Sequence, residues 1–290
     1  MRELQELSSK LLSEGDVSVV IGYEEGPRGV RPAFIRTPEE TNRLVFDHRA
    51  VQNLAVYLSP RRAHLRKRGR PAVVIKGCDA RAVAGLLRES QISRDDVVLI
   101  GVRCGGVYRD PESNGPLSEE NVADRCTGCD LREPGHVDHL VGELPSEPPA
   151  TDRRKSRIAG IEAMSPEERF DFWSSELERC IRCHACREVC PMCVCERCVC
   201  EKTDPSWVES SPHLRGALAW QITHALHLAG RCSDCGECER ACPAGIPLSL
   251  IKGKVNQVVE DRFDYRAGDD PDVPSPLGDF RLEDDQEFIK

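Results

Sequence analysis

The sequence predicts an α/β domain with a mostly parallel sheet, followed by an α-helical domain organised around cysteines. Two observations carry this prediction. Before residue 142, short runs dense in Val and Ile alternate with a helical pattern, as buried parallel strands and their crossovers do. Between residues 180 and 243, one four-cysteine pattern closed by proline occurs twice, with a helical pattern between the copies. A chain of 290 residues has room for two such domains.

The α/β domain is expected over residues 1–142. A helix is predicted at Asp79–Glu89 because Ala80, Val83 and Leu86 fall on one helical face. With the strands on either side it forms a βαβ unit, which requires a parallel sheet and a right-handed crossover. The predicted strands are Val17–Tyr23, Pro32–Arg36, Ala72–Lys76 and Val97–Val102, and further helices are expected at residues 3–13 and 48–58.

The second half of the chain divides by composition. Residues 143–163 are rich in proline and charge and are expected to be a linker. The helical domain is expected over residues 164–258. Ser165 and Glu168 form a capping box, and Phe170, Trp173 and Leu177 then form an apolar stripe expected in the core. A further helix is predicted from His213 to Ala229, ending at Gly230.

Residues 259–290 form an acidic, Pro-containing tail. Residues 260–290 hold eleven acidic and four basic residues, hence a net charge of −7. Such a segment buries too little apolar surface to fold alone. It is either a solvated, disordered end or an arm that drapes over a partner protein, with Phe280, Leu282, Phe288 and Ile289 as anchors.

The repeated cysteine pattern is C-x2-C-x2-C-x3-C-P. Bacterial ferredoxins use this run to hold two 4Fe-4S clusters, with the fourth thiolate of each run crossing to the other cluster. Zinc, the alternative, usually takes separated C-x2-C pairs or Cys/His sets. Disulfides are disfavoured because no secretory signal is recognised before the first domain, which predicts a reducing cytoplasm. The expected ligand sets are Cys180, Cys183, Cys186 and Cys242 for one cluster, and Cys232, Cys235, Cys238 and Cys190 for the other.

A third cluster is expected in the α/β domain. Cys78 and Cys104 each follow a predicted parallel strand, and the carboxyl ends of neighbouring parallel strands face one crevice. Cys126 and Cys129 form a C-x2-C pair that could close over it. The alternative is two buried structural cysteines and an incidental pair.

The remaining candidates have several interpretations. Cys193, Cys195, Cys198 and Cys200 could hold zinc or a further iron–sulfur centre, or be free thiols shielding the first cluster. His184 is expected to pack beside the first cluster rather than to ligate it. For His213, His224 and His227, a satisfied surface or core role is favoured over contact with a quinone or a cluster. Gly101, Gly105 and Gly106 lie in a glycine-containing loop after a strand, a weak signal for a phosphate-bearing cofactor such as flavin.

Two family resemblances follow from these motifs. The paired cysteine runs are similar to the α-helical ferredoxin domain found in the iron–sulfur subunits of heterodisulfide reductase and of succinate dehydrogenase. Residues 76–83, 100–104 and 126–129 resemble the β subunits of deazaflavin-reducing hydrogenases and formate dehydrogenases. In that family, the resemblance implies, the cysteines hold a cluster, and many members bind flavin beside it.

These features together predict an iron–sulfur electron-transfer subunit of a soluble, cytoplasmic, anaerobic redox complex. The expected partners are the catalytic subunit of a hydrogenase or formate dehydrogenase, a heterodisulfide-reductase-like flavoprotein, or both. The alternatives are a flavin-dependent oxidoreductase acting on a deazaflavin-like carrier, and a structural zinc protein. The net charge of −9 argues against nucleic acid, and the lack of any apolar stretch of about 18 residues argues against a membrane span.

Overall fold

A five-stranded sheet forms the centre of the N-terminal half of the chain. The computed structural model describes residues 1–62, 64, 69–145, 151–280 and 282–283. The sheet has the order β2-β1-β3-β4-β5; β1 and β2 pair antiparallel, and the other neighbours pair parallel. This confirms the mostly parallel sheet. Its strands are β1 (Val19–Gly26), β2 (Gly29–Ile35), β3 (Pro71–Ile75), β4 (Val98–Val102) and β5 (His139–Val141).

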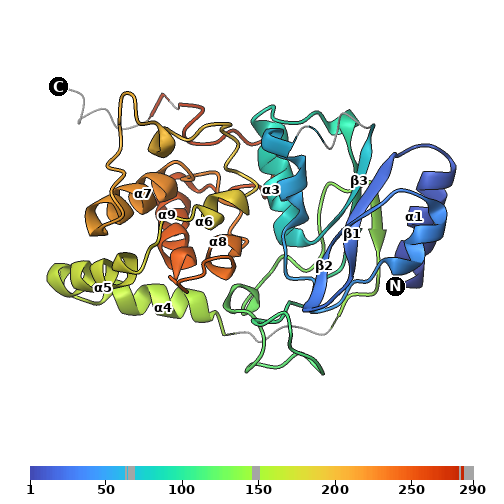
Figure 1. Ribbon diagram of the computed structural model, residues 1–290, viewed down its shortest axis with the longest axis horizontal. Helices are drawn as coiled ribbons and strands as arrows, with labels where there is room; N and C mark the ends of the chain where they lie inside the picture. The colour runs from blue at the N-terminus through green and yellow to red at the C-terminus, as the bar shows by residue number, and fades with distance from the viewer. Residues whose placement is uncertain (63, 65–68, 146–150, 281, 284–290) are drawn as a thin grey trace.

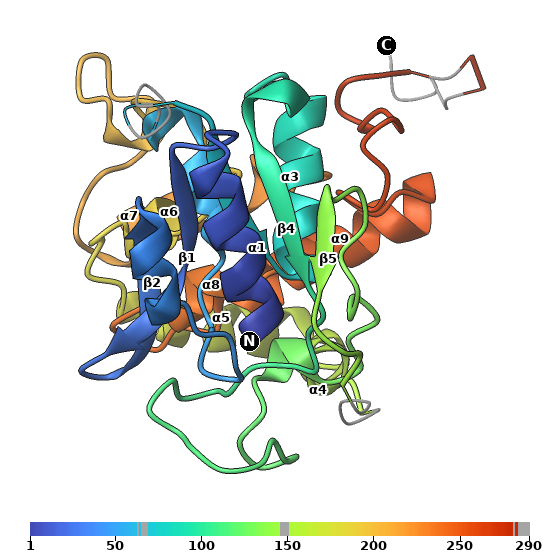
Figure 2. The ribbon, with the colours of Figure 1, turned by 90° about the vertical axis from the view of Figure 1, so that its right-hand side faces the viewer.

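The two faces of the sheet are covered differently (Figures 1 and 2). Helix α1 (Arg2–Ser13) lies on one face, and α3 (Gly77–Arg88), which connects β3 to β4, lies on the other. Every residue of β3 and β4 is buried, which explains their unbroken apolar sequence. Strand β5 was not predicted, because its three residues are too few to show the sequence pattern of a strand.

The helix expected at residues 48–58 is wrong over most of its length. The chain is irregular until Asn53, whose side chain accepts a hydrogen bond from the Ala55 amide (2.9 Å), and a 3₁₀ turn follows at Leu54–Leu58. Asparagine competes with a helix in this way by bonding to its own backbone. The other 3₁₀ turns are η1 (Pro38–Arg43), η3 (Pro60–Arg62), η4 (Arg94–Asp96), η5 (Asp124–Cys126) and η6 (Val199–Glu201).

The C-terminal half is built from helices beside the α3 face of the sheet (Figure 1). The capping box of Ser165 and Glu168 is confirmed. Phe170 corrects the predicted core stripe, because its side chain is 61% exposed whereas Leu177 is buried. The helices are α4 (Arg153–Glu162), α5 (Pro166–Glu178), α6 (Ala185–Glu188), α7 (Leu214–Leu226), α8 (Glu237–Arg240) and α9 (Leu248–Phe263).

Both borders of the helical region differ from the sequence expectation. Part of the segment 143–163, expected to be a linker, is helix α4, which packs against α9 and buries Ile158. Helix α9 continues to Phe263, beyond residue 258. The apolar residues of both segments are buried only by contacts with distant parts of the chain. Composition alone therefore led to the prediction of a linker and a tail.

The halves are joined by ion pairs and by the start of the acidic tail. Arg231 pairs with Glu89 at the end of α3 (2.6 Å). Arg266 binds Asp130 through two hydrogen bonds of 2.6 and 2.8 Å, and Arg81 donates to the Ala267 carbonyl (2.8 Å). The beginning of the tail therefore lies on this chain itself. Phe280 and Leu282 are exposed, and Phe288 and Ile289 lie outside the described residues.

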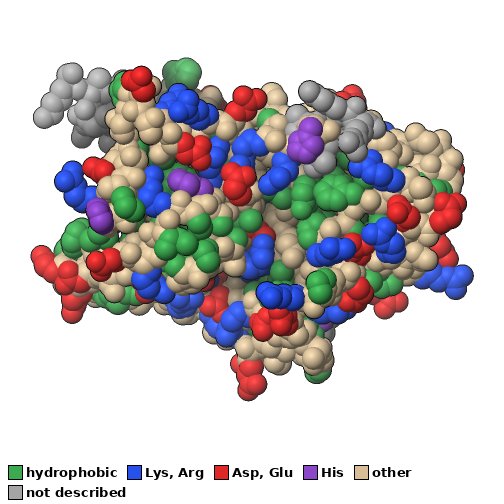
Figure 3. Space-filling model, in the orientation of Figure 1, with side chains coloured by type: hydrophobic (Ala, Val, Ile, Leu, Met, Phe, Trp, Pro, Cys, Tyr) green, Lys and Arg blue, Asp and Glu red, His purple; other side chains and the backbone are tan. Residues whose placement is uncertain are grey.

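Acidic and basic side chains alternate over the face drawn in Figure 3. None of the helices in the described part of the chain combines the length and apolarity that crossing a membrane requires.

Candidate metal centres

The four cysteines of the α/β half line one cavity. Cys78 stands in the first turn of α3, Cys104 follows the end of β4, and Cys126 and Cys129 belong to the loop that includes η5. All four line a cavity of about 260 Å³. The parallel arrangement of β3 and β4 is what brings Cys78 and Cys104 to the same edge of the sheet.

The local backbone shapes this cavity. A Cβ on Gly77 would lie 2.2 Å from the Leu131 carbonyl oxygen, so only glycine lets this loop approach the start of α3. Asp79 accepts a hydrogen bond from the Lys76 amide (3.0 Å), the capping role expected of an aspartate there. Asp130 pairs with Arg266.

Cys126 of this group is buried, Cys78, Cys104 and Cys129 are partly buried, and two of the four sulfurs accept backbone hydrogen bonds. The Gly106 amide donates to Cys104 Sγ and the Val107 amide to Cys126 Sγ, each at 3.4 Å. Burial raises the pKa of the Cys104 thiol to about 11. A buried thiolate is thus unfavourable without compensating positive charge, which iron supplies when it binds. Thiols converging on one cavity with amide donors suit a 4Fe-4S cluster.

The cavity also reaches the helical half. Cys235 lines it together with the four cysteines of the α/β half. Arg125 lies beside it, donating to the Cys235 carbonyl oxygen (2.6 Å) and pairing with Glu237 (2.9 Å). Burial lowers the pKa of Arg125, but Glu237 and the nearby thiols Cys126 and Cys78 outweigh burial and raise it overall.

The two cysteine runs have the same backbone conformation. Arg182 and His184 in the first run have positive φ (52° and 58°), and so do Asp234 and Gly236 at the matching positions of the second (62° and 67°). Positive φ at two alternate residues bends each loop, and α6 or α8 then starts within it. His184 therefore shapes the loop, and its ring packs edge-on against Trp220 (4.7 Å between ring centroids).

The first group of the helical half lines one small cavity. Its members are Cys180, Cys183, Cys186 and Cys242, so the last cysteine of the second run lies with the first three of the first run. The Gln221 side-chain amide, on α7, is 3.9 Å from both Cys180 Sγ and Cys186 Sγ. This neighbour was not foreseen, because nothing in the spacing of the cysteines points to residue 221.

The second group is Cys232, Cys235, Cys238 and Cys190. Burial, together with nearby negative groups that include Cys190, raises the pKa of Cys232 to about 12 and that of Cys235 to about 11. Burial also raises the pKa of Cys238. Lys252, on α9, is buried here and acts in the opposite direction on Cys238. Neither Lys252 nor Arg125 was predicted, since each joins the site only through the tertiary fold.

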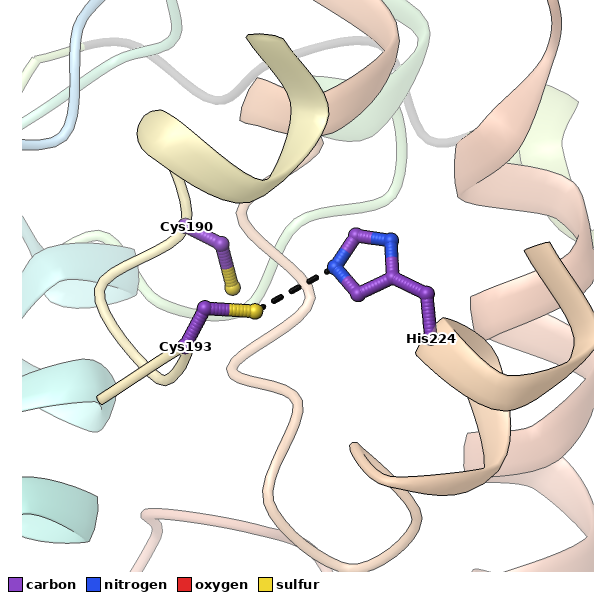
Figure 4. A group of neighbouring side chains, drawn as sticks. All are labelled: Cys190, Cys193 and His224. Carbon is purple, nitrogen blue, oxygen red and sulfur yellow. Dashed lines mark hydrogen bonds between the residues drawn. The ribbon is translucent and has the colours of Figure 1, made fainter. Parts of the chain in front are cut away.

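The extra cysteines do not gather at a single point. Cys193 Sγ lies 3.3 Å from His224 Nε2, and these atoms and Cys190 Sγ lie within 4.8 Å of one another (Figure 4). Cys195 is exposed, whereas Cys200 is buried beside Cys198, which adds to the effect of burial in raising the pKa of Cys200 to about 11. Within the described residues, Cys195, Cys198 and Cys200 join no such compact group of three metal-binding side chains.

The histidines on or near α7 separate into different environments. His224 is buried and stacks on Trp220 (4.9 Å between centroids, 13° between planes). Burial, aided by Lys252, lowers the pKa of His224 to about 2, so its ring is neutral. His213 precedes α7 and His227 follows it, both exposed.

The three glycines of the loop after β4 have different surroundings. A Cβ on Gly101 would meet Pro134 at 2.8 Å, so this glycine serves close packing. Gly105 and Gly106 line both the cysteine cavity and a neighbouring cavity of about 320 Å³.

Comparison with known proteins agrees with this geometry. Residues 176–246 match the family of 4Fe-4S dicluster domains. The chain is similar to the F420-dependent formate dehydrogenase subunit beta of Methanocaldococcus jannaschii, with 24% identity over 286 positions covering 70% of this chain and 75% of that protein. It is likewise 24% identical to the F420-dependent formate dehydrogenase 1 subunit beta of Methanococcus maripaludis, with 71% and 75% covered. These likenesses and the dicluster domain support an iron–sulfur electron-transfer subunit of an oxidoreductase that binds 4Fe-4S clusters.

Proposed function

We propose that the chain holds three 4Fe-4S clusters in a row and links a catalytic subunit to a second redox partner. The ligand sets are the three groups described above: Cys78, Cys104, Cys126 and Cys129; then Cys232, Cys235, Cys238 and Cys190; then Cys180, Cys183, Cys186 and Cys242. When bound, each cluster supplies one-electron chemistry. The cysteines are ligands and not nucleophiles.

The shared cavity carries this proposal. Cys235, from the second group, lines the same cavity as the four cysteines of the α/β half, so these two groups are neighbours. Lys252 lies within electrostatic reach of Cys238, from the second group, and of Cys186, from the first. These contacts support an order in which the second group stands between the other two.

The exposure of the first group, which contains Cys183, supports a contact with another protein. Cys183 is exposed, and the neighbouring Ile181 is 69% exposed. The relatives are beta subunits of formate dehydrogenases, which favours the catalytic subunit of a formate dehydrogenase or hydrogenase as one partner. We propose a heterodisulfide-reductase-like flavoprotein as the other, following the likeness of the cysteine runs.

Iron and acid-labile sulfide analysis of anaerobically purified protein tests the number of clusters. About twelve irons per chain are expected for three clusters of four irons. The double substitution of Cys78 and Cys104 by serine is expected to lower this to about eight. Cys195→Ser, an exposed cysteine outside the three groups, is the matched control and should keep about twelve. About eight irons in the unmodified protein would contradict the third cluster, and zinc without iron would contradict the whole proposal.

A second candidate function is flavin-dependent reduction of a deazaflavin-like carrier. It is favoured by the cavity beside Gly105 and Gly106 and by the F420 dependence in the names of both relatives. Acid extraction followed by flavin fluorescence decides between the two: one flavin per chain supports the enzyme, and iron without flavin supports the electron-transfer role alone.

A further inference from the structure

Lys252 differs from three other cations near the cysteines, each of which has a carboxylate partner. Arg125 pairs with Glu237, Arg154 with Asp234, and Arg231 with Glu89. Lys252 is only 4% exposed, and among the described residues no carboxylate oxygen lies within 4 Å of its ammonium. A buried charge without a counterion is strongly unfavourable, so the position makes sense only if negative charge arrives from elsewhere.

A hydrogen bond from Lys252 fixes the orientation of the His224 ring. Its Nζ lies 3.3 Å from His224 Nδ1. An ammonium can only donate, so Nδ1 accepts and the ring proton stays on Nε2. That nitrogen faces Cys193 Sγ at 3.3 Å, as Figure 4 shows, and donates to it. His224 is thus held as a hydrogen-bond donor to sulfur and is not free to ligate a metal.

The chain of contacts lies between both cysteine groups of the helical half. Cys193 Sγ is within 4.8 Å of Cys190 Sγ, which belongs to the second group. Leu248, one helical turn before Lys252 on α9, lines the cavity of the first group. Cys238, Cys232 and Cys190 of the second group and Cys186 of the first all act to raise the pKa of Lys252. Helix α9 reaches both regions because it packs against α7 and α8.

We propose that Lys252 is the shared countercharge of the two cluster sites in the helical half, and that it favours the reduced form of both. This inference rests on the proposed function, because the negative charge comes from clusters with four thiolates each. A cluster gains one negative charge when it accepts one electron. A fixed positive charge nearby therefore stabilises the reduced form and raises the reduction potential. His224 acts as a positioning residue that holds the ammonium in place.

Lys252→Met tests the proposal, since methionine keeps much of the length and removes the charge. Potentials are measured by redox titration followed by electron paramagnetic resonance, with signals assigned through single Cys→Ser variants of each group. The equilibrium constant for reduction should fall at least tenfold at both helical-half clusters, about 59 mV for one electron. The cluster of the α/β half should move much less, because Arg125 and not Lys252 lies beside it.

Two further variants separate charge from shape. Lys254→Met is the matched control: it is two residues along α9, 38% exposed and paired with Glu162 (2.8 Å), and it should shift neither potential. Lys252→Arg keeps the charge and should stay close to the unmodified protein. If Lys252→Met assembles no clusters while Lys252→Arg does, the need for a charge is supported.

Three results would overturn the proposal. They are unchanged potentials in Lys252→Met, a shift at only one of the two clusters, and a Lys252→Arg variant that behaves like Lys252→Met. The iron content of the unmodified protein distinguishes failure of the proposed function from failure of the role of Lys252. If it shows no pair of clusters in the helical half, the proposed function fails; if the pair is present and unmoved, only the role of Lys252 fails.

Discussion

The ion pair between Arg125 and Glu237 gives the sharpest prediction for stability. It joins the loop of η5 to α8, and its two side chains are only 10% and 3% exposed. Glu237→Gln keeps the shape but leaves Arg125 buried without its carboxylate, although the Cys235 and Val51 carbonyls still accept hydrogen bonds from it. Breaking a buried pair from one side costs about 3–5 kcal/mol.

We take the lower end, about 3 kcal/mol, because those two carbonyls remain. At about 2–4 °C per kcal/mol for a chain of this size, the thermal midpoint should fall by about 6–12 °C. Near-ultraviolet circular dichroism under anaerobic conditions measures it. Glu6→Gln is the control, because its pair with Arg2 is exposed and worth at most about 1 kcal/mol. Equal midpoints for the two variants would refute the reasoning.

The same pair predicts a pH dependence. Burial works to raise the pKa of Glu237, but Arg125 and Arg240 outweigh it and hold the pKa below its ordinary value. A lowered folded-state pKa stabilises the protein above the unfolded value of about 4.3 and loses that effect as pH falls through the folded value. The midpoint difference between the unmodified protein and Glu237→Gln should therefore be full near neutral pH and shrink in acid below about pH 4. A difference that grows in acid would contradict the assigned sign.

Three other predictions follow from single contacts. Cys242→Ser should impair the cluster held mainly by the first run, because Cys242 lines the cavity of Cys180, Cys183 and Cys186. Electron paramagnetic resonance measures the loss. If the signal is lost only for the cluster held mainly by the second run, the crossed ligation is contradicted. Gly77→Ala should destabilise the fold by more than about 1 kcal/mol in denaturant titration, because its Cβ would lie 2.2 Å from the Leu131 carbonyl oxygen, whereas Gly160→Ala, with open space in α4, should be neutral or stabilising. Asp130→Asn should speed proteolysis of the tail, because Arg266 loses its charged partner. Arg266 lowers the pKa of Asp130, so the tail of the unmodified protein should also loosen as pH falls below about 4. Equal cleavage rates for the variant and the unmodified protein would refute the role of Asp130 in holding the tail.

The sequence predicted those features of the fold and the site that depend on residues close together along the chain. The parallel sheet was predictable because β3 and β4 are buried on both faces and carry unbroken runs of Val and Ile. The candidate ligands were predictable because cluster binding demands cysteines at fixed short intervals. Residues 48–58 were mispredicted because their burial follows from packing against the sheet and α3 and has no helical period.

The sequence by itself determined the kind of site: sixteen cysteines, two of their runs in a ferredoxin spacing, on a chain with an α/β half. The tertiary structure decided how the groups stand to one another. Cys235 lines the cavity of the α/β cysteines, and Arg125, Gln221 and Lys252 come to the sulfurs from distant segments. The physical reason is that ligation to a cluster depends on spacing along the chain, whereas burial and electrostatics depend on which segments the fold brings together.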